Sequence, residues 1–338
     1  MRLLSVIILL CCSLQLSAQR GINILSTLDS LNYTDELPKE LLSTKSLVLV
    51  KVPPKRTSPE VRGDWKKPGE VLQTGFKKGG IDAVSYYYID DVFSGPEVVS
   101  AFAEKFAERQ LQNVIFIIEE SGKHKVIITE ITDKDNLITA GQEAWRIEGD
   151  NLETMANTIY LKAANSGQDR SNLLVIDVPI YGEMAHAINA RRGEYFDVNF
   201  SSETLAIPAF ADTSQINKVM SKYPYKYEIV DPTKTEKELR SDGHQYILYY
   251  VHTIGKHVKE ILEYPTTNTE TAYISEVTAG DSNKAKVVSI NVNTPVYKFY
   301  IKHIYSENVF LGTKWDAAPT WWEALDNYVT NLKNQLVD

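Results

Sequence analysis

The chain has 338 residues and a formal net charge of −8, and 43% of its residues are hydrophobic. No block of lysine and arginine forms a basic stripe, which argues against capture of nucleic acid or of an anionic membrane. Apart from the N-terminal leader, no apolar run approaches the roughly 18 residues of a membrane-spanning helix. A chain of this length can bury the cores of two ordinary domains.

Residues 1–18 have the pattern of a secretory signal peptide. Arg2 supplies a basic start, an apolar run follows over Leu3–Cys12, and the small residues Ser17–Ala18 form a cleavage site. We therefore expect export by a cleaved signal peptide to the periplasm, the outer membrane or the extracellular space. A lipoprotein is the alternative because two cysteines end the apolar run, but the residues before them fit a lipidation site poorly. The Ser-Ala-Gln ending resembles leaders of exported proteins from Bacteroidota-type bacteria, a resemblance that covers the leader alone.

Both cysteines belong to this leader, so the mature chain contains none. Disulfides, thiolate catalysis and metal sites with cysteine ligands are therefore excluded. The sequence also lacks a G-x-S-x-G nucleophile motif, and the glycines of Gly75–Asp82 do not have the spacing of a phosphate loop. We expect no cofactor, and we interpret these glycines as the end of a helix.

After an N-terminal extension over 19–41, a first module over 42–165 shows alternating strand and helix patterns. Runs of β-branched and aromatic residues predict strands, and apolar residues at helical spacing predict helices. The expected order is strand Leu47–Val52, helix Trp65–Phe76, strand Ala83–Asp90, helix Pro96–Gln112, strands Asn113–Glu120 and Lys125–Thr132, and a last helix ending at Ala164. This order predicts a layered α/β arrangement with a mixed sheet.

A connecting segment over 166–199 leads to a second module over 200–338. In the connection, Leu173–Ile180 has the pattern of a strand and Tyr181–Gly193 that of a helix. The clear helices of the second module are Thr213–Tyr223 and the C-terminal segment. Its expected strands are Thr204–Phe210, Tyr225–Asp231, Gln245–Thr253, His257–Tyr264, Thr271–Thr278, Lys286–Val292 and Val296–Tyr305.

A spaced pair of residues occurs once in each module. Trp145 and Trp315 each stand eight residues before a glutamate, Glu153 or Glu323, and an apolar helical stripe follows in both copies. A capping-type residue lies three positions before each glutamate, which predicts a capping box. These capping residues are Asp150 and Thr320. We interpret the tryptophan as packing beneath the helix and the glutamate as a helix-start residue; a catalytic glutamate in each copy is the alternative.

Two further matches support an internal duplication. Residues 42–52 match 200–210, where short polar residues open an apolar strand. Residues 113–124 match 245–257, where a buried run ends in a Gly-Lys-His turn. We therefore predict the fold class α/β (α+β), with two tandem, divergent copies of a layered α/β module with mixed sheets, the second more β-rich.

Two adjacent carboxylates, Asp90 and Asp91, form the first candidate site. They follow a predicted strand and precede the helix opened by Pro96. Ligands of open α/β sheets gather at the carboxyl ends of strands, and adjacent acids there can bind a divalent metal or shift each other's pKa. The alternative is that these acids merely begin a loop and favour the following helix N-terminus.

His252 and His257 form the second candidate site. They flank the stretch Thr253–Lys256, and a hairpin there would bring the imidazoles close enough to share a metal. Glu120 and His124 flank the matching turn of the first copy. No third ligand is evident, so solvated hairpin positions are the alternative.

Aromatic residues form the third candidate, a binding surface. Tyr223, Tyr225 and Tyr227 alternate along one predicted strand, and Trp321 is expected to point away from the apolar stripe begun by Trp322. Exposed aromatic rows can stack on sugars or receive a protein partner. The alternative is that the stripe is the buried face of a half-covered sheet.

Taken together, these features favour an exported, non-catalytic binding or structural component of the bacterial envelope or cell surface. Its expected partner is another envelope protein, contacted through sheet edges or through the tyrosine-rich second module. A secreted hydrolase-type enzyme with an acid or metal site near Asp90 and Asp91 is one alternative. A glycan-binding module that uses exposed aromatics is the other.

Overall fold

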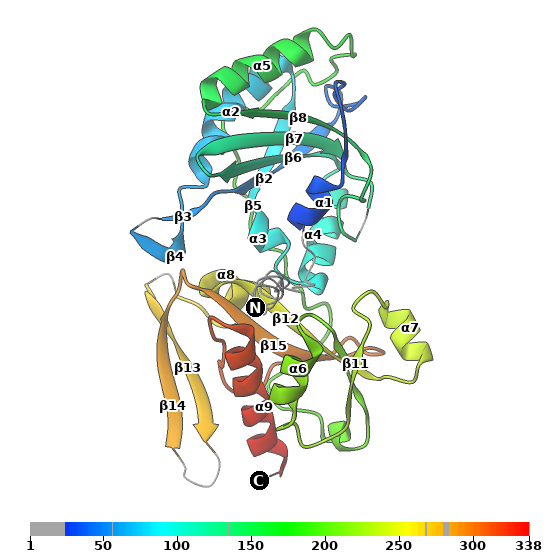
Figure 1. Ribbon diagram of the computed structural model, residues 1–338, viewed down its shortest axis with the longest axis vertical. Helices are drawn as coiled ribbons and strands as arrows, with labels where there is room; N and C mark the ends of the chain where they lie inside the picture. The colour runs from blue at the N-terminus through cyan, green and yellow to red at the C-terminus, as the bar shows by residue number, and fades with distance from the viewer. Residues whose placement is uncertain (1–23, 56, 134, 268, 280–283, 338) are drawn as a thin grey trace, which may run out of the picture.

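The computed structural model describes residues 24–337 with the exception of 56, 134, 268 and 280–283. The expected signal peptide lies outside these residues. The chain forms two halves, each built on a mixed six-stranded sheet, stacked along the long axis of the molecule (Figure 1). Within the described chain, no helix is both long and apolar enough to cross a membrane.

The first sheet has the order β1-β8-β7-β6-β2-β5. Its central strand β2 is parallel to β5 and β6, and β7 and β8 continue the sheet in antiparallel pairs. Alternate residues of β2 serve the two faces: Leu47 and Leu49 pack towards α4, whereas Val48 and Val50 pack towards α2 and α5. The elements are α1 (Ile24–Asp29), β1 (Asn32–Thr34), β2 (Lys45–Lys51), α2 (Lys66–Gly79), β5 (Asp82–Tyr88), α3 (Ile89–Val92), α4 (Pro96–Glu108), β6 (Leu111–Glu120), β7 (Lys123–Glu130), β8 (Glu143–Gly149) and α5 (Leu152–Ala164).

The second sheet has the order β11-β10-β12-β15-β16-β9. Here β10 is the central strand, parallel to β11 and β12, and β15 runs antiparallel to β12. Helices α6 and α9 cover one face, and α7 and α8 contribute to the core on the other. The elements are β9 (Arg192–Gly193), the 3-10 helix η1 (Val198–Ser201), β10 (Leu205–Pro208), α6 (Thr213–Met220), β11 (Tyr227–Val230), α7 (Glu236–Ser241), β12 (Tyr246–Ile254), α8 (Gly255–Ile261), β15 (Pro295–His303), β16 (Val309–Phe310) and α9 (Trp321–Val337).

The two halves share one topology, which confirms the prediction of two similar α/β modules with mixed sheets. The strand order β5-β2-β6-β7-β8 of the first corresponds to β11-β10-β12-β15-β16 of the second, and the final helices α5 and α9 correspond. Each module also carries a separate two-stranded ribbon. In the first this is β3 (Pro54–Lys55) with β4 (Ser58–Arg62), and in the second it is β13 (Ala272–Ala279) with β14 (Lys284–Asn291).

Three predicted elements are wrong. The segment His257–Tyr264 was expected as a strand, but it lies largely in helix α8, because its buried residues Val258, Ile261 and Leu262 have helical spacing. Leu173–Ile180 forms no strand, and Tyr181–Gly193 forms no helix; the chain there is irregular apart from single bridges and β9.

The repeated tryptophans have different surroundings. Trp145 lies on β8 and shares a core cluster with Met155 and Ile159 of α5, as predicted. Trp315 instead packs edge-to-face on Tyr264 and Tyr273, away from the core beneath α9, so that part of the prediction is wrong.

The two predicted capping boxes also differ. Helix α5 is capped by Asn151, which accepts from the Thr154 N–H at 2.8 Å, and not by Asp150. At the start of α9 the Thr320 hydroxyl donates to the Glu323 carboxylate at 2.8 Å, so these two residues do pair. Neither helix start gives evidence for the alternative that Glu153 and Glu323 are catalytic residues.

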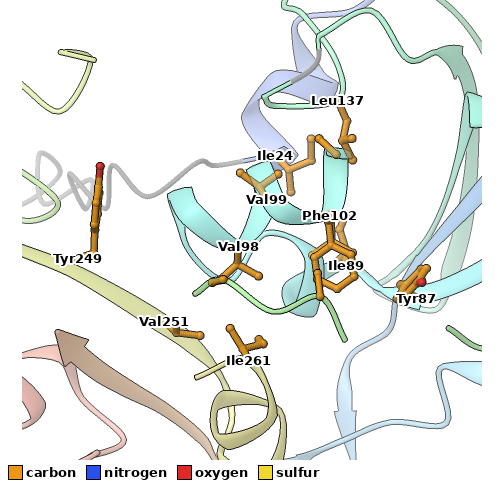
Figure 2. Close-up of a cluster of buried hydrophobic side chains, with 14 of the residues drawn as sticks. Ile24, Tyr87, Ile89, Val98, Val99, Phe102, Leu137, Tyr249, Val251 and Ile261 are labelled. Atoms are coloured by element: carbon orange, nitrogen blue, oxygen red, sulfur yellow. The ribbon is translucent and has the colours of Figure 1, made fainter. Parts of the chain in front are cut away.

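One hydrophobic cluster runs through both modules. Val98 of α4 points towards Val251 of β12 and Ile261 of α8 (Figure 2). The approach is close at Gly95, where a Cβ atom would lie 2.4 Å from the backbone oxygen of Tyr250. The modules therefore form a single packed body at this boundary.

Candidate functional site

The candidate site lies where the first module meets the second. Strands β2 and β5 of the first module end at Lys51 and Tyr88, and the short helix α3 follows with Asp90 and Asp91. Strand β12 of the second module brings its carboxyl end to the same place. The carboxyl ends of strands are where the loops of α/β sheets place polar groups, and the structure joins two such ends from different modules.

Asp91 is the centre of the contact, and its side chain is only 1% exposed. Arg62 donates to both carboxylate oxygens, with Nη1–Oδ2 at 2.7 Å and Nη2–Oδ1 at 2.5 Å. The Thr253 hydroxyl donates to Oδ1 at 2.5 Å, and His257 Nδ1 lies 2.9 Å from the same oxygen. Because an ionised carboxylate only accepts hydrogen bonds, Nδ1 of His257 carries a hydrogen.

The charges around Asp91 decide its protonation. Burial alone would raise the pKa of Asp91, but the neighbouring His257 and Arg62 outweigh burial and hold the pKa well below its usual range. Asp91 is therefore a permanently ionised, fully hydrogen-bonded group. It is poorly suited to give or take a proton.

Arg62 links the β3–β4 ribbon to this network. Besides Asp91, its guanidinium donates to the Thr253 hydroxyl at 2.6 Å and lies over the ring of Tyr88, 4.0 Å from the centroid. Thr253 thus accepts from Arg62 and donates to Asp91. Both Asp91 oxygens and the Thr253 hydroxyl are hydrogen-bonded within this cluster, which is the arrangement that a buried ion pair requires.

Asp90 has a different environment although it is the next residue. Its side chain is 44% exposed and forms an ion pair with Lys51, with Nζ–Oδ1 at 2.8 Å. Both residues border a cavity of about 470 Å³ that Arg62 and His252 also line. Asp90 is the accessible acid of the pair, and Asp91 is the structural one.

His252 lies on the second-module side of that cavity. Its ring stacks on Tyr297 with 3.8 Å between centroids and 8° between planes, and its backbone N–H donates to Ser94 O at 2.7 Å. Burial lowers the pKa of His252 to about 4, with a smaller opposing effect of Asp90. The imidazole is therefore neutral at pH 7.

A second cavity, of about 440 Å³, is bordered by Arg62 and Asp91. It is also bordered by His257 and Lys256 from the second module, by Trp65 and Lys66 from the first, and by Tyr181 from the connecting segment. Lys66 lies over the Tyr181 ring, with Nζ 4.4 Å from the centroid. Arg62 and Tyr88 thus border both cavities at the module boundary, whereas Asp91 borders only the second.

The predicted metal site at His252 and His257 is wrong in its geometry. The two residues do not flank a hairpin, because helix α8 begins at Gly255 directly after β12. His252 borders one cavity and His257 the other, and Nδ1 of His257 is engaged by Asp91. Over the residues that the structure describes, no three His, Cys, Asp or Glu side chains gather in a way that could hold a metal.

The predicted aromatic surface is largely buried. Tyr223 and Trp321 belong to the core of the second module, where Trp321 packs edge-to-face on Phe210. Tyr225 and Tyr227 are half-buried against the same core. The predicted buried face of α9 is wrong. The buried stripe begins with Trp321, and Trp322 is the exposed tryptophan, with 51% of its surface accessible.

Sequence reasoning singled out Asp90 and Asp91 as one candidate site and His252 and His257 as another. It did not predict that the two pairs meet at one boundary, and it missed their partners. Arg62 and Thr253 carry no motif, since a single arginine in a charged loop and a threonine in an apolar strand are ordinary residues. Comparison of the chain with protein-family models, curated proteins and solved structures returns no significant match. Functional inference for this chain therefore rests on its own geometry.

Proposed function

We propose that the protein is an exported, non-catalytic binding component of the bacterial envelope or cell surface that acts through protein–protein contacts. The observation that supports this most is the state of its acids and histidines. Asp91 accepts from Arg62, Thr253 and His257 within the protein, and His252 is stacked and neutral. General acid–base catalysis needs a group that can exchange a proton with a substrate; the Asp91 carboxylate is already occupied by internal hydrogen bonds, and His252 is a weak base.

The same contacts have a structural purpose. They fasten the modules to each other, together with a second ion pair in which Lys302 Nζ lies 2.6 Å from Glu97 Oε2. A rigid two-module body is suited to present surfaces to a partner. Export is part of the proposal because residues 1–18 have the pattern of a signal peptide.

Chemical cross-linking in the native envelope tests the proposal. Tagged mature protein is cross-linked in envelope preparations and purified under denaturing conditions. One partner protein should be recovered in near-stoichiometric amount, and an unrelated exported protein carrying the same tag should not recover it. Recovery of no specific partner would argue against a protein-binding function.

A hydrolase-type enzyme is the second candidate, and one observation favours it. His257 is oriented by Asp91 and borders the cavity of about 440 Å³, as an acid–histidine pair in a general-base role would. Asp90 is accessible in the neighbouring cavity. On this alternative, Asp90→Asn abolishes turnover without lowering the free energy of unfolding. If the protein is a non-catalytic binding protein, neither wild type nor Asp90→Asn should turn over a substrate.

The glycan-binding alternative depended on exposed aromatics, and two of its four named residues are not exposed. Tyr223 and Trp321 are buried in the core of the second module. Trp322 is the exposed tryptophan of this helix, and a single exposed ring needs no functional explanation. We do not propose glycan binding through Trp321.

A further inference from the structure

The ribbon β13–β14 stands beside the second sheet, with β13 next to α9 and β14 on the outside (Figure 1). The outer edge of β13 is covered. The Glu276 N–H donates to Trp315 O at 2.8 Å, the Thr278 N–H donates to Asn331 Oδ1 at 3.1 Å, and the Asn331 amide donates back to Glu276 O at 3.2 Å. The outward backbone groups of β13 are therefore hydrogen-bonded within the protein, to Trp315 and to Asn331 of α9.

The outer edge of β14 is open. Glu276 and Thr278 lie opposite Val287 and Ala285 in the antiparallel register, and they direct their backbone groups away from β14. Residues opposite each other in such a non-hydrogen-bonded pair both point outward, so Val287 directs its N–H and C=O to the free edge. No strand of the described chain pairs with that edge.

This edge is unusual among the sheet edges of the molecule. The described edge strands β1, β11 and β9 have three, four and two residues. The edge strand β5 has seven residues, but its outer side is bonded to the connecting segment: the Tyr86 N–H donates to Ile180 O at 2.8 Å, and the Gly182 N–H donates to Tyr86 O at 3.2 Å. Strand β14 has eight residues, and Val287 to Ile290 contains neither a charge nor a proline. Its side chains Val287 and Val288 are 57% and 41% exposed, and Ile274 of β13, diagonal to Val287 in the register, is 54% exposed. Monomeric proteins usually shorten or block such an edge.

We propose that the open edge of β14 binds an extended segment of another protein by strand addition. This inference rests on the proposed protein-binding function and locates its surface. The incoming strand would pair with the outward backbone groups, place β-branched side chains beside Val287 and Val288, and place a carboxylate opposite Lys286. A second copy of the chain fits less well, because residues 284–291 contain two lysines and no acid to pair with them.

A backbone-specific variant tests the inference. Val287→Pro removes the N–H that points outward and leaves the bonds to β13, so the ribbon should stay folded. Val287→Thr is the matched control, because it keeps the N–H and the β-branched shape. The probe is a short synthetic peptide of alternating valine and threonine with one glutamate, and the same peptide N-methylated at alternate residues.

The mature protein should bind the parent peptide saturably, as measured by fluorescence anisotropy. Val287→Pro should bind at least about tenfold more weakly, Val287→Thr within about twofold of wild type, and the N-methylated peptide should bind at least about tenfold more weakly than its parent. Unchanged binding by Val287→Pro or by the N-methylated peptide, or no binding by wild type, would overturn the inference. A dimer in sedimentation that Val287→Pro converts to monomer would identify a second copy as the occupant and would also overturn it.

Failure of this inference can be told apart from failure of the proposed function. If wild type and Val287→Pro recover the same cross-linked envelope partner equally, protein binding stands and the β14 edge is the wrong surface. If neither recovers a partner while the peptide binds wild type alone, the edge is competent but the proposed envelope function is contradicted.

Discussion

Removal of the Asp91 carboxylate is the perturbation that bears most directly on the boundary between the modules. Asp91→Ala leaves the Arg62 guanidinium without its bidentate acceptor, and it leaves Thr253 and His257 without theirs. The Arg62 side chain is only 11% exposed, so water can replace the lost carboxylate only in part. The folded state then holds a charge that is desolvated and unpaired.

The magnitude follows from that burial. Removing one partner of a buried ion pair costs about 3–5 kcal/mol, because the other charge stays behind without compensation. We therefore expect Asp91→Ala to lower the free energy of unfolding at pH 7 by about 3–5 kcal/mol. The double variant with Arg62→Ala should cost less than the sum of the two single variants, because no unpaired charge then remains.

Urea unfolding of the protein without residues 1–18, followed by circular dichroism, measures these differences. Asp90→Ala is the matched control, because the Asp90–Lys51 pair is 44% and 31% exposed and should contribute less than about 1 kcal/mol. The reasoning would be refuted if Asp91→Ala cost no more than Asp90→Ala, or if the Arg62 and Asp91 effects were simply additive.

Three further predictions concern other parts of the structure. The pKa of His252 is about 4 in the folded protein, so between pH 6.5 and 4 the unfolded chain takes up a proton that the folded chain does not. Stability should therefore fall by up to about 3 kcal/mol as the pH falls through this range, and His252→Phe should abolish that part of the fall in urea midpoints. Gly95→Ala should cost about 1–3 kcal/mol in the same assay, because its Cβ would meet the Tyr250 oxygen at 2.4 Å; a neutral effect would contradict the close contact. Trp321→Ala should cost about 3–5 kcal/mol and Trp322→Ala less than about 1, and the reverse order would place the wrong face of α9 in the core.

Most of the architecture could be predicted from the sequence because the hydrophobic residues of its strands and helices are strongly patterned. The apolar run Leu47–Val50 is buried on both faces of the first sheet, as a central parallel strand requires. The prediction failed where the hydrophobic pattern of a segment does not match its burial in the folded protein. Residues 257–264 look like a strand by composition, but Val258 and Ile261 bury one helical face. Leu173 and Leu174 are apolar yet almost fully exposed, so hydrophobicity alone predicted a strand that is absent.

The candidate site was predictable to a smaller extent. Asp90 and Asp91 were recognised because they follow a strand, but nothing in their order says which of them is buried. The contacts that decide this are distant in sequence: Thr253 lies 162 positions after Asp91 and 191 positions after Arg62. Such pairings depend on how the modules dock. The open edge of β14 likewise follows from register, which a single strand pattern does not determine.

Replacement of His257 by alanine tests most directly whether these residues fasten the modules or perform chemistry. Wild type and His257→Ala are compared for their free energy of unfolding and for hydrolysis of a panel of ester, phosphoester, glycoside and peptide substrates. If His257 is a structural partner of Asp91, the variant is less stable and the two proteins are equally inactive on every substrate. A wild-type hydrolysis rate that disappears in an equally stable variant would contradict that assignment.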